Sequence, residues 1–276
     1  MKILTAAQMR LESLYHYQKF NADRLVQTLS TQSIYCPNPS TFNDPWDCKP
    51  WFDKSVLTDS VSREKLIRWF DAIGRVHNPE LPEAERRRRV DIMRRDKVFL
   101  ERMVDECSAS IAQVIDARYR VYCLTTDALS TLMWSHYADN HQGICLEFGV
   151  KNVVVCAAQK VEYRDVYPAL RLDATDEYQN LLPILTKSEV WKYEDEYRLI
   201  AQDEAHAVHA DTLKTTNNFL RLPLGALKAI VLGCGAPQAT VGMVTEIIGK
   251  HSPGMQVKRA VRTPNRYALT IEVAPG

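Results

Sequence analysis

The sequence predicts an α+β fold in which a mostly antiparallel sheet forms the core and a helical segment is inserted into it. Short β-prone segments lie within the first 50 residues and return after Arg120. Between them, residues 55–118 carry apolar side chains at three- and four-residue steps, the period of an amphipathic helix. We find no internal repeat, and we therefore expect one domain, 1–276, with a helical insertion at about 55–118.

The N-terminal elements are a strand, a helix and a second strand. Residues 11–17 are β-prone, and Asn21 can cap a helix that runs to Leu29. Residues 33–36 predict a short strand. Three prolines follow within 37–47, a density that predicts a rigid, turned loop. In that loop Asn43 and Asp44 can bond the neighbouring backbone, and such turns need no function to explain them.

Two helices are predicted within the insertion. The first surrounds residues 62–73, and the second is a long helix with Lys97 as the one interruption of its apolar stripe. Acidic residues are interleaved with the arginines of the second helix, namely Arg86 to Arg89, Arg94 and Arg95. This favours a solvated helix face over a phosphate-binding surface. The stripe consists of Val90, Met93, Leu100, Val104, Cys107, Ile111 and Val114.

After Arg120 the pattern changes to strands with short helices between them. The predicted helices are one capped by Asp127 or Ser130 and ending near Tyr137, one at 176–185 and one at 241–250. The glycines at 233 and 235 lack the third glycine of a dinucleotide fingerprint, so they predict a tight turn. The predicted strands are 121–124, 143–148, 196–200, 219–222, 229–232 and 267–271, with a further pairing within 153–161.

Composition excludes several classes of protein. Lys and Arg number 35 against 34 Asp and Glu, so the net charge of +1 gives no global attraction to nucleic acid or to an acidic membrane. Seven cysteines without a C-x-x-C pair predict reduced thiols in a cytoplasmic protein. The apolar stretches are too short to span a bilayer, so we expect no membrane partner.

Three short clusters, far apart in the sequence, concentrate aromatic and ionisable residues. Aromatic rings supply stacking faces, and His, Ser and Glu supply hydrogen bonds and proton chemistry, which a pocket for a polar ligand needs. We therefore predict that the clusters form one site. They are Leu14 to Tyr17, Trp134 to Tyr137, and Trp191 to Arg198.

The third cluster carries the strongest chemistry. On a strand, Glu194 and Glu196 would face one side together with Arg198, and two carboxylates raise each other's pKa unless a cation intervenes. A surface strand edge neutralised by the arginine is the alternative interpretation. The neighbouring Trp191 and Tyr193 favour a site.

His16 and His136 can each have a structural role as well as a functional one. Ser135 and His136 are adjacent, and side chains one apart on a helix diverge by about 100°, so they make no catalytic pair. His136 can be satisfied by backbone or act as the general base of a hydrolase, and His16 can be structural. His136, His141 and Cys145 fit no familiar zinc spacing, so no metal is expected.

The order of the motifs resembles the bacterial family called domain of unknown function 2971. The likeness covers most of the chain, although the segment 55–118 holds no motif that matches. That family brings no settled biochemical role. The residues that carry the likeness are Leu14 to Tyr17, Phe42 to Pro45, Met133 to Asp139, Gly143, Phe148 and Trp191 to Arg198.

A more distant likeness concerns the order of elements. A strand with His16, a helix, a strand with Tyr35 and a late strand opened by Glu196 is similar to the ADP-ribosyltransferase fold, including the branch that modifies DNA bases in toxin–antitoxin systems. The resemblance implies NAD as substrate without a metal: His16 contacts the NAD ribose, and Tyr35 or Tyr137 stacks on nicotinamide. Glu196 would be the catalytic acid, in preference to Glu194, because it directly precedes the matching strand at 197–200. A fixed carboxylate stabilises the oxocarbenium-like cation that forms when the nicotinamide–ribose bond breaks.

Two functions are therefore expected. The first is an NAD-consuming transferase or glycohydrolase, a toxin or antiphage effector with a nucleic-acid or protein acceptor. The second is a noncatalytic module that binds a nucleotide or a partner protein. The transferase hypothesis requires that His16 and Glu196 line one cleft, and it fails if they lie on opposite faces. The further expected binding residues are Tyr17, Asn43, Asp44, Trp134, Ser135, His136 and Arg198.

Overall fold

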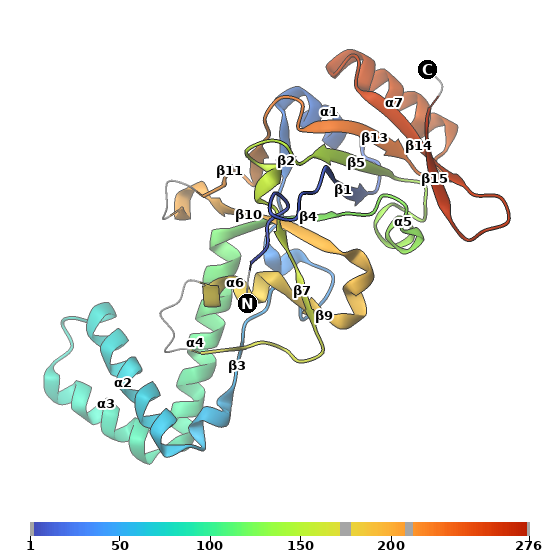
Figure 1. Cartoon of the computed structure of the whole chain (residues 1–276). Coiled ribbons are helices and arrows are strands. Elements are labelled where there is room, and N and C mark those ends of the chain that lie inside the picture. The colour runs from blue at the N-terminus through green and yellow to red at the C-terminus, as the bar shows by residue number, and fades with distance from the viewer. Residues whose placement is uncertain (1–2, 172–177, 208–211, 275–276) are drawn as a thin grey trace. The chain divides into compact units, whose positions relative to one another are not determined.

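The computed structural model describes residues 3–171, 178–207 and 212–274. The chain divides into two compact units, and each is considered by itself (Figure 1). The first unit consists of Met1–Thr41, Arg118–Tyr163 and Glu189–Gly276, and the second of Phe42–Ala117 and Arg164–Ser188. Within the described ranges, no helix combines the length and the apolar character needed to cross a membrane.

A large sheet organises the first unit. Its strand order is β15-β14-β13-β5-β1-β4-β10-β11-β12-β2, with β6 added beside β10. The pairs β10–β11 and β13–β14 are parallel and the others are antiparallel, so the predicted α+β class with a mostly antiparallel sheet is confirmed. The strands are β1 (Ser13–Gln18), β2 (Ser33–Tyr35), β4 (Tyr119–Thr125), β5 (Ile144–Gly149), β6 (Gln159–Lys160), β10 (Glu196–Asp203), β11 (Lys214–Thr216), β12 (Phe219–Arg221), β13 (Leu227–Leu232), β14 (Gln256–Arg262) and β15 (Leu269–Val273).

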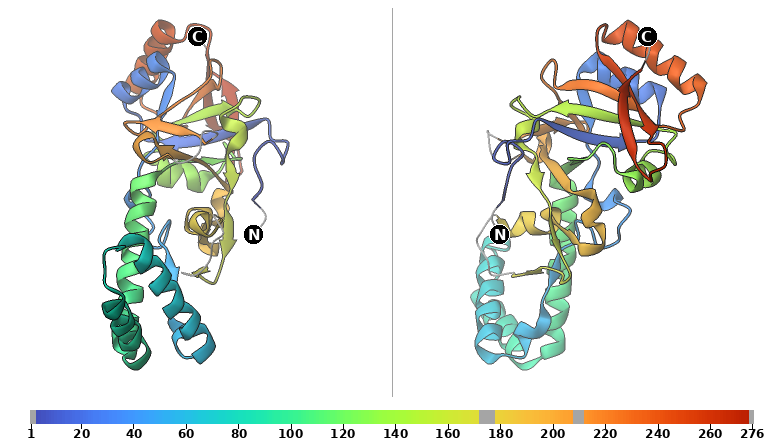
Figure 2. Two further views of the ribbon diagram at one scale, coloured as in Figure 1. Left: turned by 90° about the vertical axis from the view of Figure 1, so that its left-hand side faces the viewer. Right: turned by 45° about the vertical axis from the view of Figure 1, so that its right-hand side comes forward.

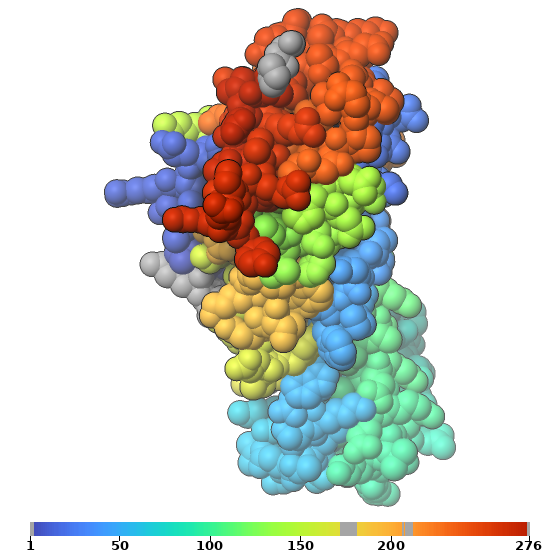
Figure 3. Space-filling view, turned by 90° about the vertical axis from the view of Figure 1, so that its right-hand side faces the viewer, coloured from blue at the N-terminus to red at the C-terminus, as the bar shows by residue number. Residues whose placement is uncertain are grey.

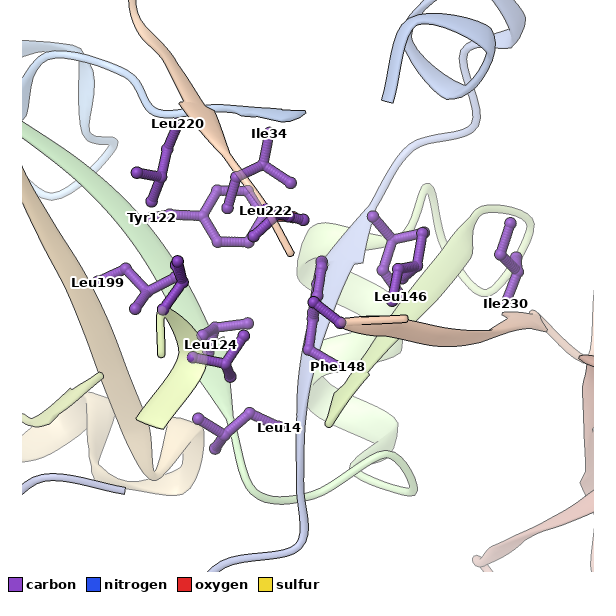
Figure 4. Close-up of a cluster of buried hydrophobic side chains, with 14 of the residues drawn as sticks. Leu14, Ile34, Tyr122, Leu124, Leu146, Phe148, Leu199, Leu220, Leu222 and Ile230 are labelled. Atoms are coloured by element: carbon purple, nitrogen blue, oxygen red, sulfur yellow. The ribbon is translucent and has the colours of Figure 1, made fainter. Parts of the chain in front are cut away.

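Alternate residues of these strands define two faces of the sheet. On the first face, apolar side chains form the main core, which Figure 4 shows as Leu14, Leu124, Leu146 and Leu199 converging with their neighbours. Two helices, α1 (Ala22–Thr31) and α7 (Gln238–His251), contribute further apolar side chains to the same core. Burial of this apolar surface is the main stabilising term of the unit. The side chains that the helices supply are Leu25, Leu29, Val244 and Ile248.

The second face of the sheet carries a smaller core under the helix α5 (Thr131–Tyr137). Trp134 of that helix is fully buried and meets the Tyr17 ring edge-on, with 5.0 Å between the ring centroids. Cys145 and Val231, from β5 and β13, complete the contact. Figure 3 shows α7 and the strands β14 and β15 side by side at the surface of this unit.

The predicted helix caps are present. Asn21 accepts a hydrogen bond of 2.8 Å from the backbone N–H of Arg24 at the start of α1. Ser130, one of the two predicted caps, accepts from the N–H of Met133 at the start of α5. Such caps satisfy backbone donors that the first helical turn leaves open, which is why these elements were predicted close to their observed bounds.

The second unit is built mainly from three helices, α2 (Ser60–His77), α3 (Glu83–Arg95) and α4 (Lys97–Arg118), which Figure 2 shows side by side. The prediction of one long helix through residues 90–114 is wrong, because the chain leaves helical geometry at Asp96. Asp96 then accepts a hydrogen bond from the N–H of Phe99 and so begins the next helix. In the sequence, Lys97 interrupts the apolar stripe at the position of this break.

Short elements complete the chain. Strands β3 (Trp51–Phe52) and β8 (Ala169–Leu170) pair in parallel, and their residues share a core with the three helices. The helix α6 (Tyr178–Leu185) leads into β9 (Thr186–Ser188), and residues 176–177 of the predicted helix lie outside the described residues. The strand β7 (Glu162–Arg164) spans the chain boundary between the units.

Candidate functional site

The structure brings the three sequence clusters together on the second face of the sheet. The Tyr137 hydroxyl donates a hydrogen bond of 2.6 Å to the Glu194 carboxylate. His136 Nδ1 and the Tyr193 hydroxyl are joined by a hydrogen bond of 2.9 Å. These contacts connect α5 to the 3₁₀ helix η4 (Glu189–Glu194), while the ring contact of Tyr17 with α5 connects the first cluster to the second.

The register of three neighbouring strands places a row of polar side chains on this face. Tyr15 of β1 pairs with Thr125 of β4, and Thr125 pairs with Glu196 of β10. Paired residues of adjacent strands point to the same face, so Tyr15, Thr125 and Glu196 form a continuous row. Tyr15 is partly exposed, and burial together with the nearby Glu147 carboxylate raises the pKa of its phenol.

Glu196 is held in a buried ion pair. The guanidinium of Arg198 donates two hydrogen bonds to its carboxylate, from Nε at 2.7 Å and from Nη2 at 2.9 Å. Glu196 is 3% exposed and Arg198 is 0% exposed. This paired geometry matches the planar fork of an arginine to both carboxylate oxygens. Each of the two carboxylate oxygens therefore accepts a hydrogen bond from Arg198.

The spacing had predicted that Glu194 and Glu196 share a strand, and in the structure they do not. Glu194 belongs to η4, and Glu196 opens β10. Asp195 between them has a φ of 38°, in the left-handed region that a residue other than glycine adopts at a cost. Its carboxylate accepts a hydrogen bond from the Thr126 hydroxyl and lies 3.2 Å from Lys160 Nζ. These two contacts hold the turn.

His16 lies on the first face of the sheet. Its ring stacks on Tyr122 with 4.2 Å between centroids, and Nδ1 donates to the Cys123 carbonyl at 2.7 Å. Burial lowers the pKa of the imidazole to about 4, so the ring is neutral. Glu196 is in register with Thr125, one residue beyond Leu124 of the first face, and therefore points to the opposite side. The prediction that His16 and Glu196 line one cleft is wrong.

Two aromatic candidates also differ from expectation. Tyr35 lies on the edge strand β2, which β11 and β12 separate from the strand of Glu196. Trp134 has no exposed surface, and its indole N–H donates to the Ala128 carbonyl at 2.9 Å, a structural role. Ser135, on the same helix, is partly exposed.

A separate cavity lies wholly within the second unit. It has a volume of about 600 Å³, within the range of small-molecule sites. Asp44, a predicted binding residue, lies in its wall, whereas its exposed neighbour Asn43 is not part of the lining. We call this cavity the Trp46 pocket. Its principal lining side chains are Asp44, Trp46, Asp47, Trp51, Tyr167, Thr186 and Lys187.

The wall of the Trp46 pocket is held by its own hydrogen bonds. Asp44 Oδ1 accepts from the backbone N–H of Trp46 at 2.9 Å, the Asx turn that the sequence predicted. The Tyr167 hydroxyl donates to the carbonyls of Trp46 and Lys49, and burial raises the pKa of that phenol. These bonds fix the loop from 44 to 49, so the pocket is preformed.

The lining of the pocket combines charged and aromatic side chains. Lys187 Nζ lies 3.6 Å from the Asp47 carboxylate, and both side chains are nearly fully buried. Trp46 and Trp51 keep 67% and 46% of their surfaces exposed, so their rings are accessible for stacking. Trp51 also meets the Tyr167 ring edge-on.

Sequence reasoning missed most of this pocket. Two tryptophans five residues apart in a proline-rich loop were a usable signal for one wall. The opposite wall comes from Arg164–Ser188, where Tyr167, Thr186 and Lys187 follow no motif. Among the residues described, no group of three or more His, Cys, Asp or Glu side chains could hold a metal ion.

Comparison with known proteins gives a match to a protein family. Residues 133–199 match the model of a family described as a protein of unknown function, DUF2971. This segment contains the second and third clusters, and the match confirms the resemblance that their motifs predicted. No curated protein and no solved structure matches the chain.

Proposed function

We propose that this chain, whose residues 133–199 carry the DUF2971 signature, is a noncatalytic binding protein with a nucleotide-class ligand in its Trp46 pocket. One observation carries the proposal: a preformed cavity of about 600 Å³ presents two accessible tryptophan rings beside buried carboxylates. Rings of this kind stack on bases, and carboxylates accept hydrogen bonds from amino and hydroxyl groups. Asp44, which the sequence predicted as a binding residue, lines this pocket and so supports the proposal.

Tryptophan fluorescence and calorimetry with a panel of nucleosides and nucleotides test this proposal. Trp46→Ala should abolish the binding that the intact protein shows, because it removes a stacking face. Tyr267→Ala is the matched control, since that ring is fully exposed and lies outside the pocket. If no member of the panel binds, or if both variants bind equally well, the proposal fails.

Because His16 and Glu196 lie on opposite faces of the sheet, the NAD-dependent transferase fails in the form that required them in one cleft, and we propose it second only in a revised form. The row of Tyr15, Thr125 and Glu196 on one face favours it, with Tyr15 taking the place that His16 was expected to fill. The strained backbone at Asp195 lies directly beside the carboxylate in question. In this form a nucleic acid or a protein would be the acceptor.

Nicotinamide release from NAD separates the two functions. A transferase releases nicotinamide when DNA, RNA or cell lysate is supplied as acceptor, and both Glu196→Gln and Tyr15→Phe reduce the rate. His16→Gln should leave the rate unchanged, because the imidazole lies on the other face. Absence of nicotinamide release with every acceptor contradicts the transferase and leaves the binding protein.

A further inference from the structure

We infer that the Trp46 pocket selects an unphosphorylated nucleoside or nucleobase over the corresponding nucleotide. The inference rests on the proposed binding function and narrows its ligand. It depends on the charge balance of the lining, on the local backbone and on one buried hydroxyl.

The charges of the pocket cancel. Lys187 Nζ forms an ion pair with the Asp47 carboxylate at 3.6 Å, so it contributes little to the attraction of an anion. A monophosphate brings close to two negative charges and would meet no net positive potential here. The lining holds three carboxylates and three cations, namely Asp44, Asp47, Asp165, Lys49, Arg164 and Lys187.

The local backbone also lacks the features of a phosphate site. Phosphates bind where a glycine-rich turn or a helix N-terminus presents free N–H groups. No glycine is among the described residues that line this pocket, and its Asp44 turn uses the N–H of Trp46 internally. An anion would therefore have to be bound by the lysine and arginine side chains of the lining, whose positive charges the aspartates of the same lining balance.

The pocket does offer groups that suit an uncharged polar ring. Trp46 and Trp51 provide flat apolar surface, and Asp44 is a buried acceptor for an amino or hydroxyl donor. Thr186 adds a further observation. It is 7% exposed, lines the pocket, and its hydroxyl finds no hydrogen-bond partner among the described residues. A buried hydroxyl without a partner is costly, and a polar ligand atom would satisfy it.

Binding measurements with matched pairs test the selection. The probes are adenosine, guanosine, cytidine and uridine, each compared with its 5′-monophosphate, together with NAD. We expect at least one nucleoside to bind. The affinity of its monophosphate should be lower by about tenfold or more. Equal or tighter binding of the monophosphate or of NAD overturns the inference but leaves the proposed function standing. Binding of no probe overturns both.

A pair of hydroxyl deletions tests the contact itself. Thr186→Val removes the hydroxyl at nearly constant volume, and we expect the affinity for the nucleoside to fall by about fivefold. The melting temperature of the free protein should not fall, because the hydroxyl makes no bond there. Thr215→Val is the control, since that hydroxyl is also buried and unpartnered in the described structure but lies in the first unit. Unchanged affinity in Thr186→Val overturns the assigned contact.

Discussion

His16 illustrates how the position of one residue in a sheet decides its chemistry. Its ring stacks on Tyr122 within the main core, and its Nδ1–H bonds the Cys123 carbonyl. Protonation would place a charge in that environment, which explains why the pKa is lowered to about 4. The residue that looked like a ligand contact in the sequence is part of the packing of β1 against β4.

The lowered pKa of His16 predicts a stability change with pH. In the unfolded chain the imidazole titrates near 6.5, so between pH 6.5 and 4 the unfolded chain binds more protons than the folded protein. The free energy of unfolding therefore falls as the pH is lowered through this window, by about 2 kcal/mol at pH 5 from this residue. Urea unfolding at pH 7 and pH 5 measures it. His16→Gln should lose most of this dependence, and an equal dependence in the variant contradicts the prediction.

The Glu196–Arg198 pair predicts a second effect at this scale. Glu196→Gln removes the carboxylate that pairs with the fully buried Arg198, so we expect a loss of roughly 3–5 kcal/mol in the free energy of unfolding. Replacing both residues by methionine removes the two charges together and should cost much less. Denaturant titrations of the single and double variants measure this. A loss below about 1 kcal/mol in Glu196→Gln contradicts a structural ion pair.

At the scale of elements, the turn between β13 and α7 is fitted against the loop that follows α5. A Cβ placed on Gly233 would lie 2.0 Å from the His141 carbonyl oxygen, a backbone atom that cannot move alone. That loop is itself held in left-handed geometry at Asp139, Asn140 and His141. The glycine therefore allows two backbone segments to approach, which is a reason for its presence other than phosphate binding.

Two glycine substitutions should have opposite effects. Gly233→Ala forces the two backbones apart and should lower the free energy of unfolding by roughly 1–3 kcal/mol. Gly242→Ala, on an open face of α7, should raise it by about 0.5–1 kcal/mol, because alanine favours the helix. Thermal or urea unfolding of both variants checks the signs. A neutral Gly233→Ala would show that the loops can separate freely.

Sequence patterns predicted elements better than their assembly. Local signals, such as the caps Asn21 and Ser130, operate within a few residues and gave the bounds of α1 and α5 closely. The faces of Glu196 and His16 depend on strand register, whose partners lie more than 60 residues away in the chain. The left-handed turn at Asp195 depends on Thr126 and Lys160, which are also distant in the sequence. The Trp46 pocket was not predicted for the same reason, because its two walls come from separate chain segments.

For the whole molecule, each unit has its own hydrophobic core. The second unit packs its helices around Leu100, whereas the core of the first unit includes Ile230, and both side chains have no exposed surface. Separate cores are able to open separately, so a single unfolding free energy need not describe the protein.

Cavity-forming variants test this independence. Leu100→Ala should cost roughly 2–5 kcal/mol and speed amide hydrogen exchange in the helices of the second unit, while the strands of the first unit keep their protection. Ile230→Ala should produce the reverse pattern. Hydrogen-exchange mass spectrometry resolves the two units by peptide. Uniform acceleration in both units by either variant contradicts independent opening.

The division of the chain has a consequence for biosynthesis. The ribosome completes the second unit once Ser188 has been added, whereas the sheet of the first unit still lacks β10 to β15, which lie within Glu189–Gly276. Strand β2 therefore cannot pair until β12 has been made, and the main core over β1, β4 and β5 still lacks the apolar residues of the C-terminal segment. Domains that complete early fold early during synthesis. We expect a nascent chain whose residues up to 188 have all left the ribosome to hold folded helices and an incomplete sheet, the stage at which a chaperone would have most to shield.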